Sequence, residues 1–166
     1  LDFDGTDDHV NCGDSFDSVT GGDNKSISAW VKSDTADCSS GSSIITILHR
    51  RSGYSAFRTY AKGYPATWRG LYIKPGNFPQ EIDSGVGVIA GEWAHVALVQ
   101  SGAEVGIYLD GVSEETTSDA SVPTISGPPN ASVGANMDGM SGFFDGSIDD
   151  VRIYDRGLST GEVELL

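Results

Sequence analysis

Val105-Gly106-Ile107-Tyr108-Leu109-Asp110-Gly111 contains the clearest local pattern in the sequence. Its first five residues are rich in β-branched and aromatic side chains, which is typical of a strand. The Asp-Gly pair that follows tolerates the positive φ angles of a two-residue hairpin turn. We therefore expect the chain to double back at this point, into residues 113–130, which have the composition of a loop or an edge strand.

Further strands are expected on both sides of this hairpin. Segments 27–32, 44–50, 70–74 and 93–100 are rich in β-branched and aromatic residues, and 132–135 is a further candidate for pairing. Helical periodicity is nearly absent. Ser159 and Glu162 have the spacing of a capping box, and Val163, Leu165 and Leu166 follow it, so one short helix is predicted at the C-terminal end.

The spacing of these segments predicts the fold class. Short strands recur at roughly ten-residue intervals with Gly-rich turns and no helix between them, which favours antiparallel sheets packed as a sandwich. The expected fold is all-β, an antiparallel two-sheet β-sandwich or jelly roll with at most one short C-terminal helix. Neither an internal repeat nor a linker-like stretch interrupts the chain, so residues 1–166 are expected to form one domain.

The charge of the chain restricts its partners. Ten Lys and Arg residues against 24 Asp and Glu residues give a formal charge of −14. Such a chain repels phosphate backbones and anionic lipids, so neither nucleic acid nor an anionic membrane is an expected partner. The sequence also has no apolar run of about 18 residues, so we expect no membrane insertion.

Five blocks of sequence carry a resemblance to a known family. They are LDFDGTDDHV (1–10), ISAWVK (27–32), GEWAHVALV (91–99), IYLDG (107–111) and FDGSIDDVRIYDR (144–156). In this order the blocks resemble the laminin-G-like, concanavalin-A-like jelly-roll family. Members of this family are commonly non-catalytic modules of secreted or surface proteins that bind glycans or proteins, often with a calcium ion. The resemblance therefore implies an extracellular or cell-surface location.

The first block is a candidate calcium site. It places four carboxylates around Gly5, and calcium requires six to eight oxygen ligands from carboxylates, carbonyls and water. In the resembled family the first and last blocks lie close together and frame such a site. The resemblance implies Asp4, Asp8 and Asp149 as side-chain ligands of Ca²⁺, with backbone carbonyls around Gly5 and Asp7.

The last block predicts a β-bulge. Phe144 and Ile148 are apolar at even positions, whereas Val151 and Ile153 are apolar at odd positions, and strict alternation cannot bury both pairs. A bulge near Asp149-Asp150 resolves the conflict and could turn Asp149 inward. The alternative to a calcium site is that Asp7 and Asp8 form Asx-turns and that Asp149 accepts backbone hydrogen bonds.

Cysteine and histidine residues add little chemistry. Cys12 and Cys38 are the only two cysteines. They are expected to form a disulfide that closes a loop in an exported protein, the alternative being two unpaired thiols. His95 lies in a core-like strand, as do Trp30 and Trp93, so a structural role is expected for all three.

A second candidate site lies in residues 50–74. Six of the ten basic residues fall in this range, interleaved with Tyr54, Tyr60, Tyr64 and Trp68. Aromatic rings can stack on sugars while Arg and Lys bind hydroxyls or carboxylates. We expect ligand contacts from Tyr64, Trp68, Arg69 and Arg58. The alternative is that the aromatic residues pack the second sheet while the charged residues pair with Asp side chains across strands.

These observations predict a non-catalytic extracellular recognition module, stabilised by calcium, that binds glycans. The alternative is a structural or adhesive unit of a surface or filament protein that binds other proteins. An enzyme is not expected. A glycan-cleaving enzyme needs two carboxylates facing one cleft, whereas the Glu residues here are few and scattered, and the chain has no Gly-x-Ser-x-Gly motif.

Overall fold

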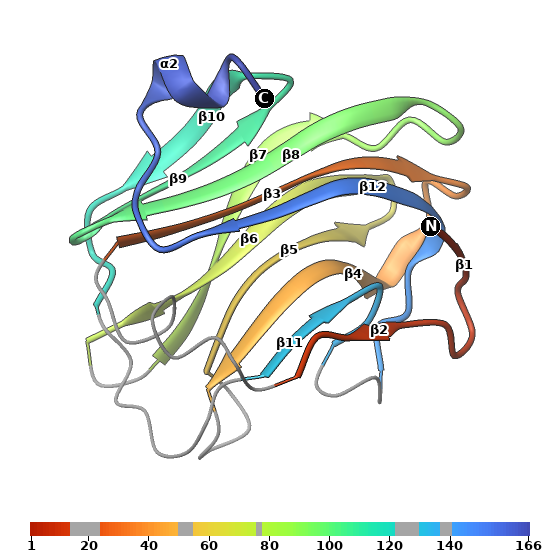
Figure 1. Ribbon diagram of the computed structural model, residues 1–166. Coiled ribbons are helices and arrows are strands. Elements are labelled where there is room, and N and C mark those ends of the chain that lie inside the picture. The colour runs from red at the N-terminus through yellow and green to blue at the C-terminus, as the bar shows by residue number, and fades with distance from the viewer. Residues whose placement is uncertain (14–23, 50–54, 76–77, 122–129, 137–140) are drawn as a thin grey trace.

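The computed structural model describes residues 1–13, 24–49, 55–75, 78–121, 130–136 and 141–166, which form two antiparallel sheets (Figure 1). The first sheet has the order β1 (Asp2–Asp4), β12 (Asp145–Tyr154), β3 (Asn24–Ser33), β8 (Trp93–Ser101), β9 (Glu104–Leu109) and β10 (Val112–Thr117). The second has the order β2 (Val10–Asn11), β11 (Asn130–Val133), β4 (Cys38–His49), β5 (Ser55–Gly63), β6 (Ala66–Lys74) and β7 (Phe78–Gly87). The predicted all-β sandwich is confirmed.

The hairpin at Asp110-Gly111 forms as predicted. β9 and β10 pair in antiparallel register, with Val112 opposite Leu109. The two residues between the strands, Asp110 and Gly111, have φ angles of 49° and 82°. These positive angles are those of the turn that matches the twist of the flanking strands. β10 is the edge strand of the first sheet.

The core lies between the two sheets and is built by alternation along each strand. β3 contributes Ile27, Ala29 and Val31, and β8 contributes Val96 and Leu98. The second sheet faces them with residues such as Phe57, Ala61, Trp68 and Ile82. At Gly70 the two sheets approach so closely that a Cβ would lie 2.3 Å from the Leu98 Cδ1 atom. Burying each large apolar side chain contributes roughly 1.5–3 kcal/mol to stability.

The predicted bulge is present in β12. The register with β3 shifts between Asp149 and Arg152, and Asp150 has a φ angle of 47°. The extra residue allows Ile148 on one side of the bulge and Val151 on the other to face the same core. Asp149 is nevertheless exposed rather than turned inward, because it pairs with Trp30 on the outer face of the sheet.

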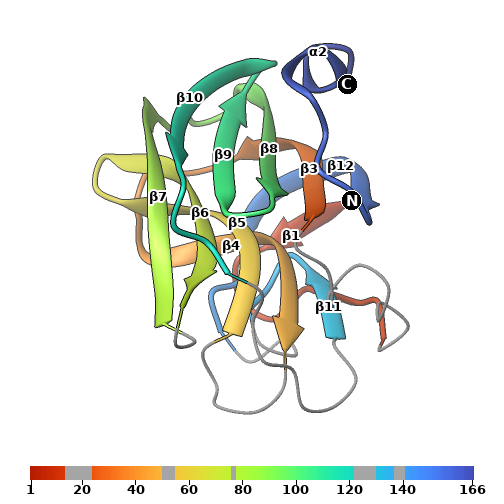
Figure 2. The ribbon, with the colours of Figure 1, turned by 90° about the vertical axis from the view of Figure 1, so that its left-hand side faces the viewer.

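The first and last strands of the chain lie side by side. β1 pairs with β12 in antiparallel register, and the Leu1 amino group donates to the Ile148 carbonyl at 3.0 Å. After β12 the chain reaches helix α2 (Thr160–Val163), which packs beside β8 and β9 (Figure 2). The predicted capping box between Ser159 and Glu162 caps this helix. No described helix has the length and apolar character needed to span a membrane.

The predicted disulfide is wrong, because Cys12 and Cys38 are both free thiols. The backbone N–H of Cys12 donates to Ala131, which pairs with Ile47 of β4. Ile47 is nine residues along β4 from Cys38, roughly 30 Å at the spacing of a strand. A disulfide requires Cα atoms less than about 7 Å apart. Burial raises the pKa of both thiols, so each remains protonated at neutral pH.

Candidate functional site

The turn after β1 gathers three carboxylates. Asp4, Asp7 and Asp8 are exposed, and each offers an oxygen within 4.8 Å of the others. The Asp4 Oδ1 atom accepts hydrogen bonds from the backbone N–H groups of Thr6, at 2.8 Å, and Asp7, at 3.4 Å. The Thr6 hydrogen bond is the main cause that lowers the pKa of Asp4. These hydrogen bonds form an Asx-turn, which is the alternative to metal binding, but they form it at Asp4 rather than at Asp7 or Asp8. Other carboxylate oxygens of the cluster remain free to bind an ion.

Asp149 does not join this cluster. Asp4 pairs with Asp145 at the start of β12, and Asp149 lies four residues further on, roughly 13 Å along the strand. The Asp149 Oδ1 atom instead accepts the backbone N–H of Asp150 at 2.9 Å. Asp145 is therefore the carboxylate of the last block that lies beside Asp4. The sequence pattern missed it because the register of β1 on β12 depends on the tertiary fold.

A polar cleft opens beside Asp4 and Asp145. Its volume is about 380 Å³, and acidic, hydroxyl-bearing and glycine residues dominate its lining. The lining comprises Asp4, Gly5, Thr35, Asp37, Cys38, Ser39, Gly41, Ser42, Gly142, Phe143 and Asp145. None of its carboxylates forms an ion pair with a cationic side chain within the described part of the chain. The cleft is thus rich in oxygen ligands that lack a positive partner.

The carboxylates of the turn after β1, rather than those of the cleft as a whole, fit calcium. Oxygens within 4.8 Å of one another are compatible with a shared ion at about 2.4 Å from each. With one oxygen from each, three carboxylates supply fewer than the six to eight ligands that calcium takes, so carbonyls and water would complete the shell. Asp4, Asp7 and Asp8 would be the ligands. Asp145 lies beside Gly5 of the same turn, where its charge would make the electrostatic potential at the site more negative.

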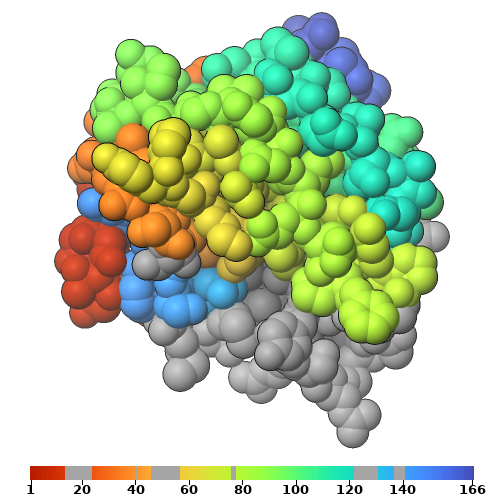
Figure 3. Space-filling model, turned by 180° about the vertical axis from the view of Figure 1, so that it is seen from behind, coloured from red at the N-terminus to blue at the C-terminus, as the bar shows by residue number. Residues whose placement is uncertain are grey.

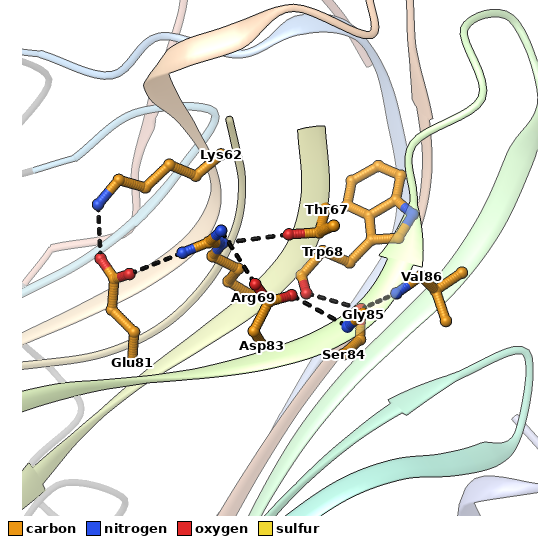
Figure 4. Close-up of polar contacts among 9 residues, drawn as sticks. All are labelled: Lys62, Thr67, Trp68, Arg69, Glu81, Asp83, Ser84, Gly85 and Val86. Atoms are coloured by element: carbon orange, nitrogen blue, oxygen red, sulfur yellow. Dashed lines mark hydrogen bonds and ion pairs between the residues drawn. The ribbon is translucent and has the colours of Figure 1, made fainter. Parts of the chain in front are cut away.

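Lys62 of β5 and Arg69 of β6 form ion pairs with acidic residues of β7 (Figure 4). The Lys62 Nζ atom lies 2.8 Å from Glu81 Oε1, and the Arg69 Nη1 atom lies 3.0 Å from Glu81 Oε2. Arg69 also binds Asp83 at 2.9 Å through Nη2, and Lys74 pairs with Asp119. The structure therefore contains the alternative arrangement, in which the charged residues pair with acidic side chains of other segments instead of remaining free for a ligand.

Glu81 is the centre of this network. Burial raises the pKa of its carboxyl group, but the hydrogen bonds from Lys62 and Arg69 and the positive charge of Lys62 outweigh burial and lower that pKa to about 2. The carboxylate is therefore ionised throughout the neutral range. Because Glu81 neutralises two cations at once, little positive charge remains on this face for an anionic ligand.

Two of the aromatic residues expected to form a platform here are buried. Trp68 is 2% exposed and belongs to the core between the sheets, so the exposure expected for it is wrong. The reason is strand parity: Pro65 ends the turn, and β6 then points Ala66, Trp68 and Tyr72 inward while Thr67 and Arg69 point outward. Tyr60 is also buried, at 1% exposure, and burial raises its pKa.

Two of the expected contact residues remain accessible. Tyr64 is 80% exposed at the turn between β5 and β6. Arg58 is partly buried and places its guanidinium carbon 4.3 Å from the centre of the Tyr60 ring. Figure 3, from behind, shows β5, β6 and β7 across the middle of this face. Arg50, Arg51 and Tyr54, which the sequence pattern grouped with them, lie outside the described residues.

The structure exposes an aromatic residue that sequence reasoning had placed in the core. Trp93 is 46% exposed, because β8 points Ala94, Val96 and Leu98 inward and Trp93 and His95 outward. The Lys32 ammonium lies 5.4 Å from the centre of the Trp93 ring. His95 is buried against Trp30, with ring centres 5.4 Å apart, and burial lowers its pKa. Parity relative to Val96 and Leu98 is the sequence signal that could have shown this.

The family model described as the concanavalin A-like lectin/glucanases superfamily (Laminin_G_3) matches residues 4–164. The chain belongs to this family, and the resemblance drawn from the five sequence blocks is confirmed. No curated protein matches the sequence significantly.

Three solved structures illustrate the likeness of fold. A native heptameric SAP-like pentraxin from Limulus polyphemus is 18% identical with a TM-score of 0.73, over 98% of this chain and 78% of that one. The CBM40 domain of the Ruminococcus gnavus IT-sialidase, bound to α2,3 sialyllactose, is 19% identical with a TM-score of 0.71, over 89% and 84%. Domain 4 of AbnA, an extracellular arabinanase from Geobacillus stearothermophilus, in complex with arabinotriose, is 16% identical with a TM-score of 0.66, over 89% and 68%.

Proposed function

We propose that the chain is a non-catalytic recognition module that works outside the cell or at its surface and binds glycans. The oxygen-lined cleft beside the junction of the first and last strands carries this proposal, since it offers many hydrogen-bonding groups. The sialyllactose and arabinotriose complexes of related folds add support. Residues 1–166 would act as one domain.

Calcium would serve the module as a structural ion. Asp4, Asp7 and Asp8 would hold it beside the junction of β1 and β12, while Asp149 would remain outside. The ion would neutralise carboxylates that form no ion pair in the described part of the chain, and it would fix the first strand against the last. Tyr64 and Arg58 are further candidates for ligand contact because they are the accessible members of the expected platform.

A glycan screen with and without chelator tests the proposal. The immobilised protein is exposed to neutral and anionic oligosaccharides in calcium buffer and again in EDTA. We expect at least one class to bind, with weaker binding in EDTA. Absence of binding to every glycan, together with self-association or binding to a surface protein, would favour the structural or adhesive unit instead. Shortening of any oligosaccharide would contradict the non-catalytic assignment.

A further inference from the structure

A small groove lies at the end of the sandwich where β7 connects to β8, away from the acidic cleft. Its volume is about 100 Å³. Trp68, Ala94 and Leu109 line its apolar interior, and Ile89 and Trp93 also line it. Trp68 thus contacts the groove from the core side, although almost none of its surface is exposed. This groove holds none of the residues expected to bind a ligand except Trp68.

The groove is bordered by apolar side chains that folding leaves exposed. Ile89 is 60% exposed and Trp93 is 46% exposed. Two contacts hold Trp93 in place. It begins β8, where it lies opposite Lys32 of β3 in the sheet, and the Lys32 ammonium lies 5.4 Å from the centre of its ring. A fixed, exposed indole beside an apolar groove is a feature of contact surfaces, since an aromatic ring buries much area at a small cost in side-chain entropy.

Two carboxylates lie beside these apolar residues. Glu92 is exposed and makes no side-chain hydrogen bond or ion pair within the described ranges. Asp110 uses its Oδ1 atom to accept the backbone N–H of His95 at 2.8 Å, which holds the carboxylate in place while Oδ2 remains available. Among the described residues, neither carboxylate has an ion-pair partner like those that neutralise Glu81 and Asp83 on the other sheet.

We propose that Trp93 and this groove form the contact surface for a neutral glycan. The inference rests on the proposed function and adds to it the ligand class and the residues involved. The C–H face of a pyranose ring packs on the indole, and sugar hydroxyls donate to the carboxylates of Glu92 and Asp110. An anionic glycan is disfavoured, because it would meet both carboxylates on a chain of formal charge −14.

The test measures binding of cellohexaose, laminarihexaose, mannohexaose and chitohexaose, with heparin and oligogalacturonate as anionic probes. Calorimetry and intrinsic tryptophan fluorescence are recorded for the wild type and for Trp93→Ala, Trp93→Phe and Glu92→Gln. We expect a neutral hexaose to bind, with at least tenfold weaker affinity for Trp93→Ala and about threefold weaker affinity for Glu92→Gln. The fluorescence change on binding should disappear in Trp93→Phe, because Trp93 is the exposed indole of the groove whereas Trp68 is almost fully buried.

Phe78→Ala is the matched control, because Phe78 is an aromatic residue, 65% exposed, at the opposite end of β7. Its affinity should stay within twofold of the wild type. Thermal unfolding of each variant shows that it is folded, and Glu92→Gln removes only an exposed charge. Equal affinity of Trp93→Ala and wild type, or binding restricted to heparin or oligogalacturonate, would overturn this inference while leaving the glycan-binding function intact. No binding to any probe would overturn both.

Discussion

The outer face of β5–β7 and the groove beside Trp93 contain similar residue types, but only the groove leaves them available. On the β5–β7 face, Lys62, Arg69, Glu81 and Asp83 are neutralised by one another. At the groove, Glu92 has no such partner in the described structure, and Trp93 is exposed. A concentration of charged and aromatic residues in a sequence therefore does not by itself identify a binding surface. The pairing of those residues in the fold decides which groups can meet a ligand.

The two tryptophans Trp68 and Trp93 give the largest predicted contrast. Trp68→Ala should lower the free energy of unfolding by about 3–5 kcal/mol, because it leaves a cavity between the sheets. Trp93→Ala should cost less than about 1 kcal/mol, because this side chain is exposed and loses mainly the contact with Lys32. Urea denaturation of both variants measures the difference. Equal losses of stability would mean that the two residues have been assigned to the wrong environments.

The turn at Asp4, Asp7 and Asp8 is a third place to compare, because its carboxylates also form no ion pair with a cationic side chain in the described residues. At a free calcium concentration about 100 times the dissociation constant, a native-state site would stabilise the fold by about 2.7 kcal/mol. Chelation should lower the melting temperature accordingly, and Asp8→Asn should remove most of that response. Asp149→Asn is the control, since Asp149 lies outside the cluster. If Asp149→Asn abolished the response and Asp8→Asn did not, the assignment of ligands would be wrong.

Glu81 gives a smaller effect with a defined pH range. Its pKa in the folded protein is about 2, below the ordinary value of 4.5, so the folded state favours the ionised form. Its contribution is therefore fully present above pH 4.5 and is lost as the pH falls toward 2. Because the carboxylate is partly solvated, we expect a contribution of about 1 kcal/mol. Glu81→Gln should flatten the acid side of the stability profile measured by denaturation, and an unchanged profile would contradict the proposed network.

The smallest expected effect belongs to Tyr64. If Trp93 provides the main glycan contact, Tyr64→Ala should change the affinity for a neutral hexaose by less than twofold, although Tyr64 is the more exposed residue. Calorimetric titration compares it with Trp93→Ala. A tenfold loss in Tyr64→Ala would move the binding surface back to the turn between β5 and β6.

Local patterns in the sequence predicted the elements that depend on neighbouring residues. The Asp110-Gly111 turn, the bulge at Asp149-Asp150 and the capping box at Ser159 all follow from short-range geometry, and all three form. β7 was missed because Pro79 and the Gly85 and Gly87 positions obscure its alternation. The burial of Trp68 and the distance between the two cysteines depend on strand parity and sheet order, which no short segment contains.

The candidate site likewise combines a local part that the sequence predicts with a part that depends on the tertiary fold. The acidic turn at Asp4 and Asp8 is local and could be found from the sequence. Its neighbour Asp145 could not, because the register between β1 and β12 selects Asp145 rather than Asp149. The groove at Trp93 joins residues from three separate segments of the chain. The exposure of Trp93 depends on which side of β8 faces the core, and the composition of the strand does not specify that side.

Nuclear magnetic resonance mapping with a neutral hexaose shows whether the ligand binds the outer face of β5–β7 or the groove beside Trp93. The three tryptophans provide three indole N–H signals, and backbone signals report Ile89, Glu92 and Tyr64 independently. We predict that titration shifts the signals of Trp93, Ile89 and Glu92 and leaves those of Arg58, Tyr64 and Arg69 in place. Shifts confined to Arg58, Tyr64 and Arg69, with Trp93 unchanged, would contradict the account.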